Sequence, residues 1–127
     1  MTNPAAPTVE QVVANITRSL NGQLPPAIQH AVTVMPEMVL RHAQDSAFAM
    51  PAEGGALSNE TRTLIYLGIA LATGSRACIE AMTNKAQGLG IESAKLLETF
   101  RIARYAEATR VLGNAEILFA KLNDPQV

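Results

Sequence analysis

Cys78 is the side chain in this sequence whose chemistry is easiest to define, because a cysteine thiolate is a strong nucleophile. Ser75 lies three residues earlier and is of a type that commonly caps helices, so Cys78 is expected in the first turn of a helix. The free backbone amides and positive dipole end of that turn favour a thiolate, and Arg76 would add positive charge. These residues predict a thiol site with Cys78 as nucleophile and with Ser75 and Arg76 in supporting roles. The alternative is that Cys78 is a small, buried apolar residue.

Few other residues suggest chemistry. His42 and Asp45 have the spacing of a base and its orienting partner on one helix face. Arg101 would bind a substrate carboxylate if it faced inward. The motifs of zinc proteases, dithiol enzymes, dinucleotide-binding proteins, P-loop NTPases and α/β-hydrolases are absent from the sequence. We therefore expect neither a metal ion nor an organic cofactor.

The elements that would position these residues are helices. Hydrophobic residues make up 48% of the chain and aromatic residues only 4%, which favours a core of Ala, Leu, Ile, Val and Met in an all-α fold. Apolar residues recur at helical spacing between breaks that contain Pro, Gly or capping residues. The pattern predicts six to seven helices, over residues 9–20, 25–35, 36–50, 59–72, 76–87, 92–113 and 114–122.

The length of 127 residues suits one domain with one core. Residues 1–7 are rich in Pro, Ala and Asn and predict a flexible arm. Residues 8–122 are expected to form a single helical domain, followed by a polar tail over residues 123–127.

Charge and cysteine content narrow the partners and the compartment. A net charge of −1 gives no basic surface for nucleic acid or an acidic membrane, and no apolar run approaches the ~20 residues of a membrane span. The N-terminus lacks the pattern of a secretory signal, and a single cysteine cannot form an internal disulfide. We therefore expect a cytoplasmic protein without nucleic-acid or membrane partners.

The segment LSNETRTLIYLGIALATGSRACIEAMTNKAQGLG, residues 57–90, resembles the core of the carboxymuconolactone decarboxylase family, which includes the alkyl hydroperoxidase D proteins. The family pattern runs from L-S-x-x-x-R/K-E-L-I through an Ala-rich helix to C-x-x-C-x-x-x-H, and then to G-L-S and a helix opening with E-E-I-x-E. The opening is matched by Leu57, Ser58, Arg62, Leu64 and Ile65, the second cysteine by Cys78, and the close by Gly90, Leu96 and Glu98. The likeness extends to about Gly113 and implies an alkyl hydroperoxidase D-like helical bundle.

The resemblance also implies that catalytic positions have been replaced. Peroxidases of the family use the cysteine pair for redox chemistry, and a glutamate and a histidine to relay protons. Here the first cysteine position is Ser75, the histidine position is Met82 and the glutamate position is Thr63. A dithiol cycle is impossible within one subunit that has one cysteine. Cys78 alone could still form a sulfenic acid that an outside thiol reduces.

Three functions are compatible with these residues. The first is a protein related to thiol peroxidases whose activity is lost or reduced to a one-cysteine reaction at Cys78. The second is a lyase on a small carboxylated lactone-type acid, with Arg101 binding the carboxylate and His42 donating a proton. The third is a non-catalytic scaffold that binds a ligand or protein. The resemblance further implies a homo-oligomer, a trimer or hexamer, with a small-molecule substrate or a thiol reductant as partner.

Overall fold

The computed structural model describes residues 6–124, and over that range the chain is helical with no strand. Seven helices follow one another: α1 (Val9–Ser19), α2 (Pro26–Val34), α3 (Pro36–Ala49), α4 (Asn59–Thr73), α5 (Arg76–Gly88), α6 (Ser93–Asn114) and α7 (Glu116–Asn123). The expected all-α class is therefore confirmed, and every expected helix is present with ends within about two residues. Most of the expected N-terminal arm and C-terminal tail lies outside the described residues, in 1–5 and 125–127.

Local interactions explain where most of the helices begin and end. Thr8 and Gln11 form a reciprocal capping box at the start of α1, with the Thr8 amide donating to the Gln11 side chain at 2.9 Å. The Ser58 hydroxyl accepts from the Thr61 amide at the start of α4. Gly74 ends α4 in the left-handed conformation, with φ of 74°, which a residue with a Cβ adopts only under strain.

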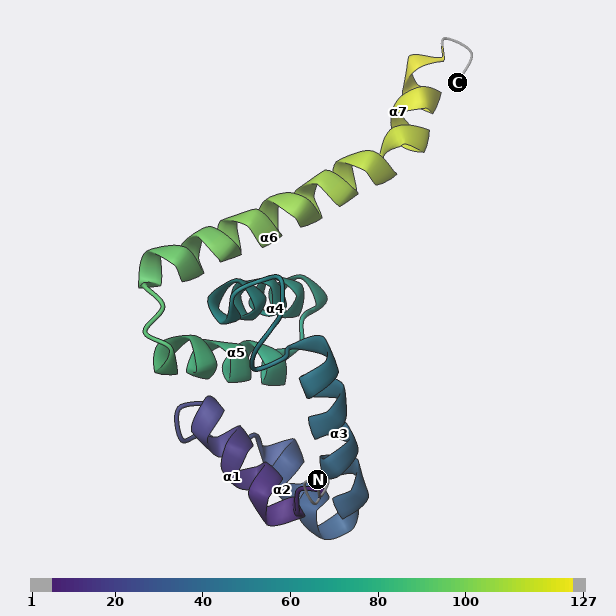
Figure 1. Cartoon of the computed structure of the whole chain (residues 1–127). Helices are drawn as coiled ribbons and strands as arrows, with labels where there is room; N and C mark the ends of the chain where they lie inside the picture. The colour runs from purple at the N-terminus through teal and green to yellow at the C-terminus, as the bar shows by residue number, and fades with distance from the viewer. Residues whose placement is uncertain (1–5, 125–127) are drawn as a thin grey trace.

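The centre of the fold is α4, which packs against α5 on one side and α6 on the other (Figure 1). The hydrophobic core joins buried Leu20, which follows α1, to Leu67 of α4 and Met82 of α5. Helices α1 and α2 pack against α3, so the N-terminal third forms its own helical layer beside α5. The two layers meet at this core cluster.

The C-terminal half of α6 and all of α7 extend away from the other helices (Figure 1). We refer to residues 104–123 as the C-terminal extension. Three large apolar side chains of α6, Leu97, Phe100 and Ile102, are exposed, because α6 touches α4 along one face only. Within residues 6–124, no helix combines the length and apolar character needed to cross a membrane.

The core cluster leads to a test of stability. Leu67 is almost fully buried between α1, α5 and α6, so Leu67→Ala should lower the free energy of unfolding by about 2–4 kcal/mol through lost burial and a residual cavity. Val34→Ala is the matched control, because Val34 is 83% exposed on α2, and its effect should stay within about 0.5 kcal/mol. Urea denaturation of both variants measures the difference. Equal effects of the two substitutions would contradict this account of the core.

Candidate functional site

Cys78 lies in the first turn of α5, at the third helical position, as its spacing from Ser75 predicted. Its side chain is partly buried, and it is a free thiol. The sulfur forms a hydrogen bond of 3.3 Å with the hydroxyl of Tyr66 on α4. The Tyr66 ring packs against the core cluster, so the hydroxyl is held in place by the packing of α4 on α5. A nucleophile and a proton donor are thus joined across two helices.

The environment of Tyr66 keeps its hydroxyl protonated. The hydrogen bond to Cys78, then burial, and then the negative charge of the Cys78 thiolate all raise the pKa of Tyr66 above its ordinary value. A phenol with a raised pKa is a hydrogen-bond donor throughout the neutral range. When Cys78 is ionised, Tyr66 therefore donates to the sulfur.

Neither Ser75 nor Arg76 supports Cys78 in the way that the sequence predicted. Ser75 does occupy the N-cap position of α5, but its side chain makes no capping hydrogen bond, so its expected capping role was wrong. Arg76 is exposed and lines a depression of about 620 Å³ between the start of α5 and the α1–α2 connection, together with Pro25 and Glu80. No interaction described in residues 6–124 joins either side chain to the Cys78 sulfur.

Thr63 and Met82, which stand at the family's relay positions, are both buried in the core. Thr63 is 0% exposed, and its hydroxyl donates to the Asn59 carbonyl at 2.8 Å within the same helix. Met82 is 8% exposed and belongs to the core cluster with Leu67. A satisfied hydroxyl and a thioether have no proton to relay at neutral pH. These residues pack the site without titrating.

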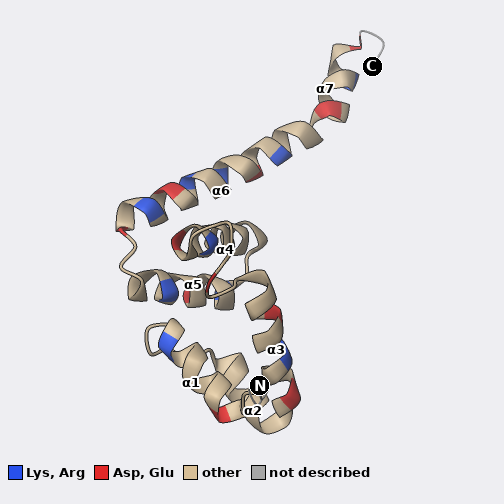
Figure 2. Cartoon of the chain, viewed as in Figure 1, with Lys and Arg blue, Asp and Glu red and all other residues tan. Residues whose placement is uncertain are grey.

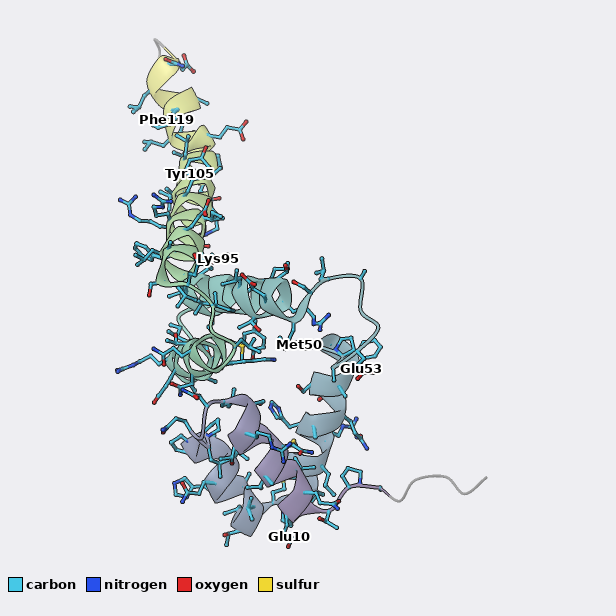
Figure 3. All side chains as sticks on the ribbon, turned by 60° about the vertical axis from the view of Figure 1, so that its left-hand side comes forward. Glu10, Met50, Glu53, Lys95, Tyr105 and Phe119 are labelled. Carbon is cyan, nitrogen blue, oxygen red and sulfur yellow. The ribbon has the colours of Figure 1, made fainter. Side chains whose placement is uncertain are left out.

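Arg62 lies one turn before Tyr66 on α4. Its side chain forms hydrogen bonds with the loop between α3 and α4. Its guanidinium donates to the Leu57 carbonyl and, at 2.7 Å, to the Pro51 carbonyl. A Cβ on Gly55 would lie 2.5 Å from the Arg62 Nη1 atom, so a side chain at residue 55 would require the guanidinium to shift. Met50 and Glu53 mark the beginning of this loop in Figure 3.

Loop and helix border a second cavity, of about 500 Å³, which is open to solvent. Arg62 and Tyr66 line it on the α4 side with Ile65 and Ile69. The remaining walls are Ala49, Met50, Pro51, Gly55, Ala56 and Leu57. The cavity is therefore apolar apart from the guanidinium and the phenol that bonds to Cys78.

Lys85 lies on the same face of α5 as Cys78 and Met82, because Met82 comes four residues after Cys78 and Lys85 three residues after Met82. Its side chain is partly buried. Burial, and secondarily the nearby positive charge of Arg62, lower the pKa of Lys85 below its ordinary value. Arg62 precedes Tyr66 by one turn of α4, and Lys85 follows Cys78 by two turns of α5.

The residues that a lyase reaction would use do not lie at this site. Arg101 is exposed on α6 and lines neither of the two cavities, so it does not have the inward orientation that carboxylate binding would require. His42 and Asp45 are both exposed on α3, and no hydrogen bond or ion pair joins them. Within residues 6–124, no group of three or more His, Cys, Asp and Glu side chains is placed to hold a metal ion.

Comparison with known families places the residues around Cys78 within one family segment. A sequence model described as the carboxymuconolactone decarboxylase family matches residues 36–119, from the start of α3 into α7. The chain belongs to this family. A search of curated proteins gave no match. The family match includes Cys78, Tyr66, Arg62 and Lys85, so the whole site lies within the matched residues.

Sequence reasoning missed Tyr66, the direct partner of Cys78. Twelve residues separate the two side chains, and no local motif links them. The available signal was their position on two successive helices: Tyr66 lies midway along α4, and the chain reverses at Gly74 before Cys78. Adjacent helices joined by a tight turn bring the end of one beside the start of the next.

The Tyr66–Cys78 hydrogen bond can be tested by titration. The chain has two tyrosines, so Tyr105→Phe leaves Tyr66 as the sole one, and tyrosinate absorbance then reports its pKa alone. Adding Cys78→Ala removes the largest cause of the raised pKa, and the midpoint should move down toward about 10. The urea-unfolded forms of the two variants should titrate together. Identical midpoints in the folded forms would refute the hydrogen bond.

Proposed function

We propose that this protein reduces peroxides through a single thiol, with Cys78 as the nucleophile and Tyr66 as the proton donor. The observation that supports the proposal is the 3.3 Å contact between the Cys78 sulfur and the Tyr66 hydroxyl. Cys78 lies at the third position of α5, near the free backbone amides of the first turn, and the raised pKa of Tyr66 keeps a proton available on the phenol. The activity is a one-cysteine form of the thiol peroxidase chemistry to which the family is related.

The reaction balances with an external thiol as reductant. The Cys78 thiolate attacks one peroxide oxygen, so that an S–O bond forms as the O–O bond breaks. The sulfur is oxidised to a sulfenic acid, and the peroxide is reduced to an alkoxide that takes its proton from Tyr66. A reductant thiol then displaces water from the sulfenic acid and forms a mixed disulfide. A second reductant thiol releases Cys78, and Tyr66 recovers its proton from water.

Peroxide assays test this proposal directly. Hydrogen peroxide or an organic hydroperoxide should convert Cys78 to a sulfenic acid that a dimedone probe traps, and Cys78→Ser should abolish trapping. Tyr66→Phe should slow peroxide consumption by roughly 10²-fold, the usual size of a general-acid effect. Ser75→Ala is the matched control and should leave the rate within about twofold, because the Ser75 side chain makes no capping bond. Peroxide consumption unchanged by Cys78→Ser would refute the proposal.

A second proposal concerns assembly: we propose that the chain forms a homo-oligomer through the C-terminal extension. Its large apolar side chains are exposed, with Ile117 71% and Leu122 70% exposed. Figure 2 shows few charges there, and between Val111 and Leu122 only Glu116 and Lys121 are charged. Tyr105 and Phe119 lie along it, away from the other helices (Figure 3). A helical surface of this kind suits burial against another copy.

The assembly proposal predicts a change of mass in solution. A variant carrying Ile117→Asp and Leu118→Asp places two carboxylates on the apolar face, so it should sediment as a monomer where the parent sediments as an oligomer. Lys121→Glu changes charge on the same helix outside the apolar set and should leave the oligomer intact. Sedimentation velocity distinguishes these forms. A monomeric parent protein would contradict the proposal.

A further inference from the structure

Helix α4 is packed on two sides and exposed on a third. It packs against α5 and α6, yet Ile65 is 47% and Ile69 59% exposed, although both belong to the central helix of the fold. They lie in a row with exposed Thr61 and Ala72, because the four residues are spaced by four, four and three positions. We refer to residues 61, 65, 69 and 72 as the open face of α4.

The open face continues into the cavity of about 500 Å³ between α4 and the α3–α4 loop. Ile65 and Ile69 line this cavity, Leu57 adds apolar surface from the loop, and Tyr66 forms part of the wall. Arg62 is the only charged residue of the lining, and its guanidinium already donates to two loop carbonyls. The open face and the cavity therefore form one apolar surface, which burial against another apolar surface would stabilise.

The exposed area of the chain is larger than a compact monomer requires. The chain exposes 9660 Å², whereas a compact monomer of 13.5 kDa exposes about 6,500 Å². Full exposure of the residues outside 6–124 would account for about 1,200 Å² of the difference. An excess of about 2,000 Å² remains in each chain, and burial of this area in two chains falls within the range of obligate dimer interfaces.

The C-terminal extension is the segment of the chain whose surface suits the open face. Within eight residues, α7 carries four large, exposed apolar side chains: Ile117, Leu118, Phe119 and Leu122. Helix α6 is continuous to Asn114 and leads α7 away from α4 of the same chain (Figure 1), so a second copy must supply the helix that covers α4. Pairing of two extensions with each other would leave Ile65 and Ile69 exposed. Reciprocal docking covers both surfaces in both chains and closes the assembly.

We propose that α7 of a second copy lies over the open face of α4 and over the cavity beside Tyr66, with each chain giving its extension and receiving the other. The candidate site is then completed by the partner subunit, because apolar side chains of that subunit exclude water from the cavity wall that Tyr66 forms. This inference rests on the proposed assembly for the existence of an oligomer. It does not depend on the thiol chemistry.

Cross-linking between copies locates the docked helix. Two proteins that both carry Cys78→Ser, one with Ile69→Cys and the other with Phe119→Cys and a purification tag, are refolded together so that subunits mix. A short bismaleimide should join the two proteins to each other. Val34→Cys is the matched control for Ile69→Cys, because Val34 is exposed on α2, and it should not be joined to Phe119→Cys. Cross-links between Phe119→Cys chains, with none to Ile69→Cys, would mean that the extensions pair with each other and would overturn the inference.

Sedimentation velocity provides a second, independent measurement. Ile69→Asp places a carboxylate on the open face, so it should convert the oligomer to a monomer although it lies outside the extension. Val34→Asp introduces the same charge on α2 and should leave the oligomer intact. An oligomer that survives Ile69→Asp would overturn the docking on α4 and leave the assembly proposal standing. A monomeric parent protein would contradict both.

Tyrosine fluorescence tests whether the partner subunit covers the site. The chain has two tyrosines and no tryptophan, so a Tyr105→Phe protein that still assembles reports on Tyr66 alone. Adding Ile117→Asp and Leu118→Asp should increase acrylamide quenching of Tyr66 by about twofold or more, because the monomer leaves the cavity uncovered. Adding Lys121→Glu instead should leave quenching unchanged. Equal quenching in the oligomer and in the monomeric variant would overturn the proposed cover.

Discussion

The packing of α4 against α5 is the contact on which the rest of the structure depends. Buried Leu67 and Met82 meet between the two helices, and Leu20 completes the cluster from the N-terminal layer. At the edge of this interface the Tyr66 hydroxyl reaches the Cys78 sulfur, so the packing of the two helices fixes their separation. The same helix α4 supports α6 on its other side. Loosening this interface would therefore disturb the core and the candidate site together.

The helices could be predicted from the sequence because their signals are local. Thr8 with Gln11, Ser58, and the prolines at positions 26 and 36 each act within one turn of the helix they begin. Ser75 shows the limit of such signals, since it occupies the N-cap position without making the bond. Burial was harder to predict, because periodicity shows that Leu97 and Ile102 are apolar and says nothing about which surface covers them. In this chain none does, and the C-terminal extension remains exposed.

The site was only partly predictable, for a related reason. The place of Cys78 in its helix follows from nearby residues, whereas its bond to Tyr66 depends on how two helices are packed. Arg62, which borders the pocket beside α4, is marked by the sequence only as a match to the family opening. Nothing in the sequence distinguishes Lys85 from a solvated lysine, because its partial burial depends on how α5 is packed.

The core also explains why this chain would not easily return to a proton relay through the positions that the family resemblance identifies. Thr63 has no exposed surface, so a glutamate there would bury a carboxylate, which is costly unless a cation pairs with it. Arg62 could be that partner only by giving up the loop carbonyls of Leu57 and Pro51. A histidine at Met82 would remove a member of the core cluster. With both positions committed to packing, Tyr66 is the one group bonded to the thiol that has a proton to give, and any reducing equivalents must come from outside the subunit.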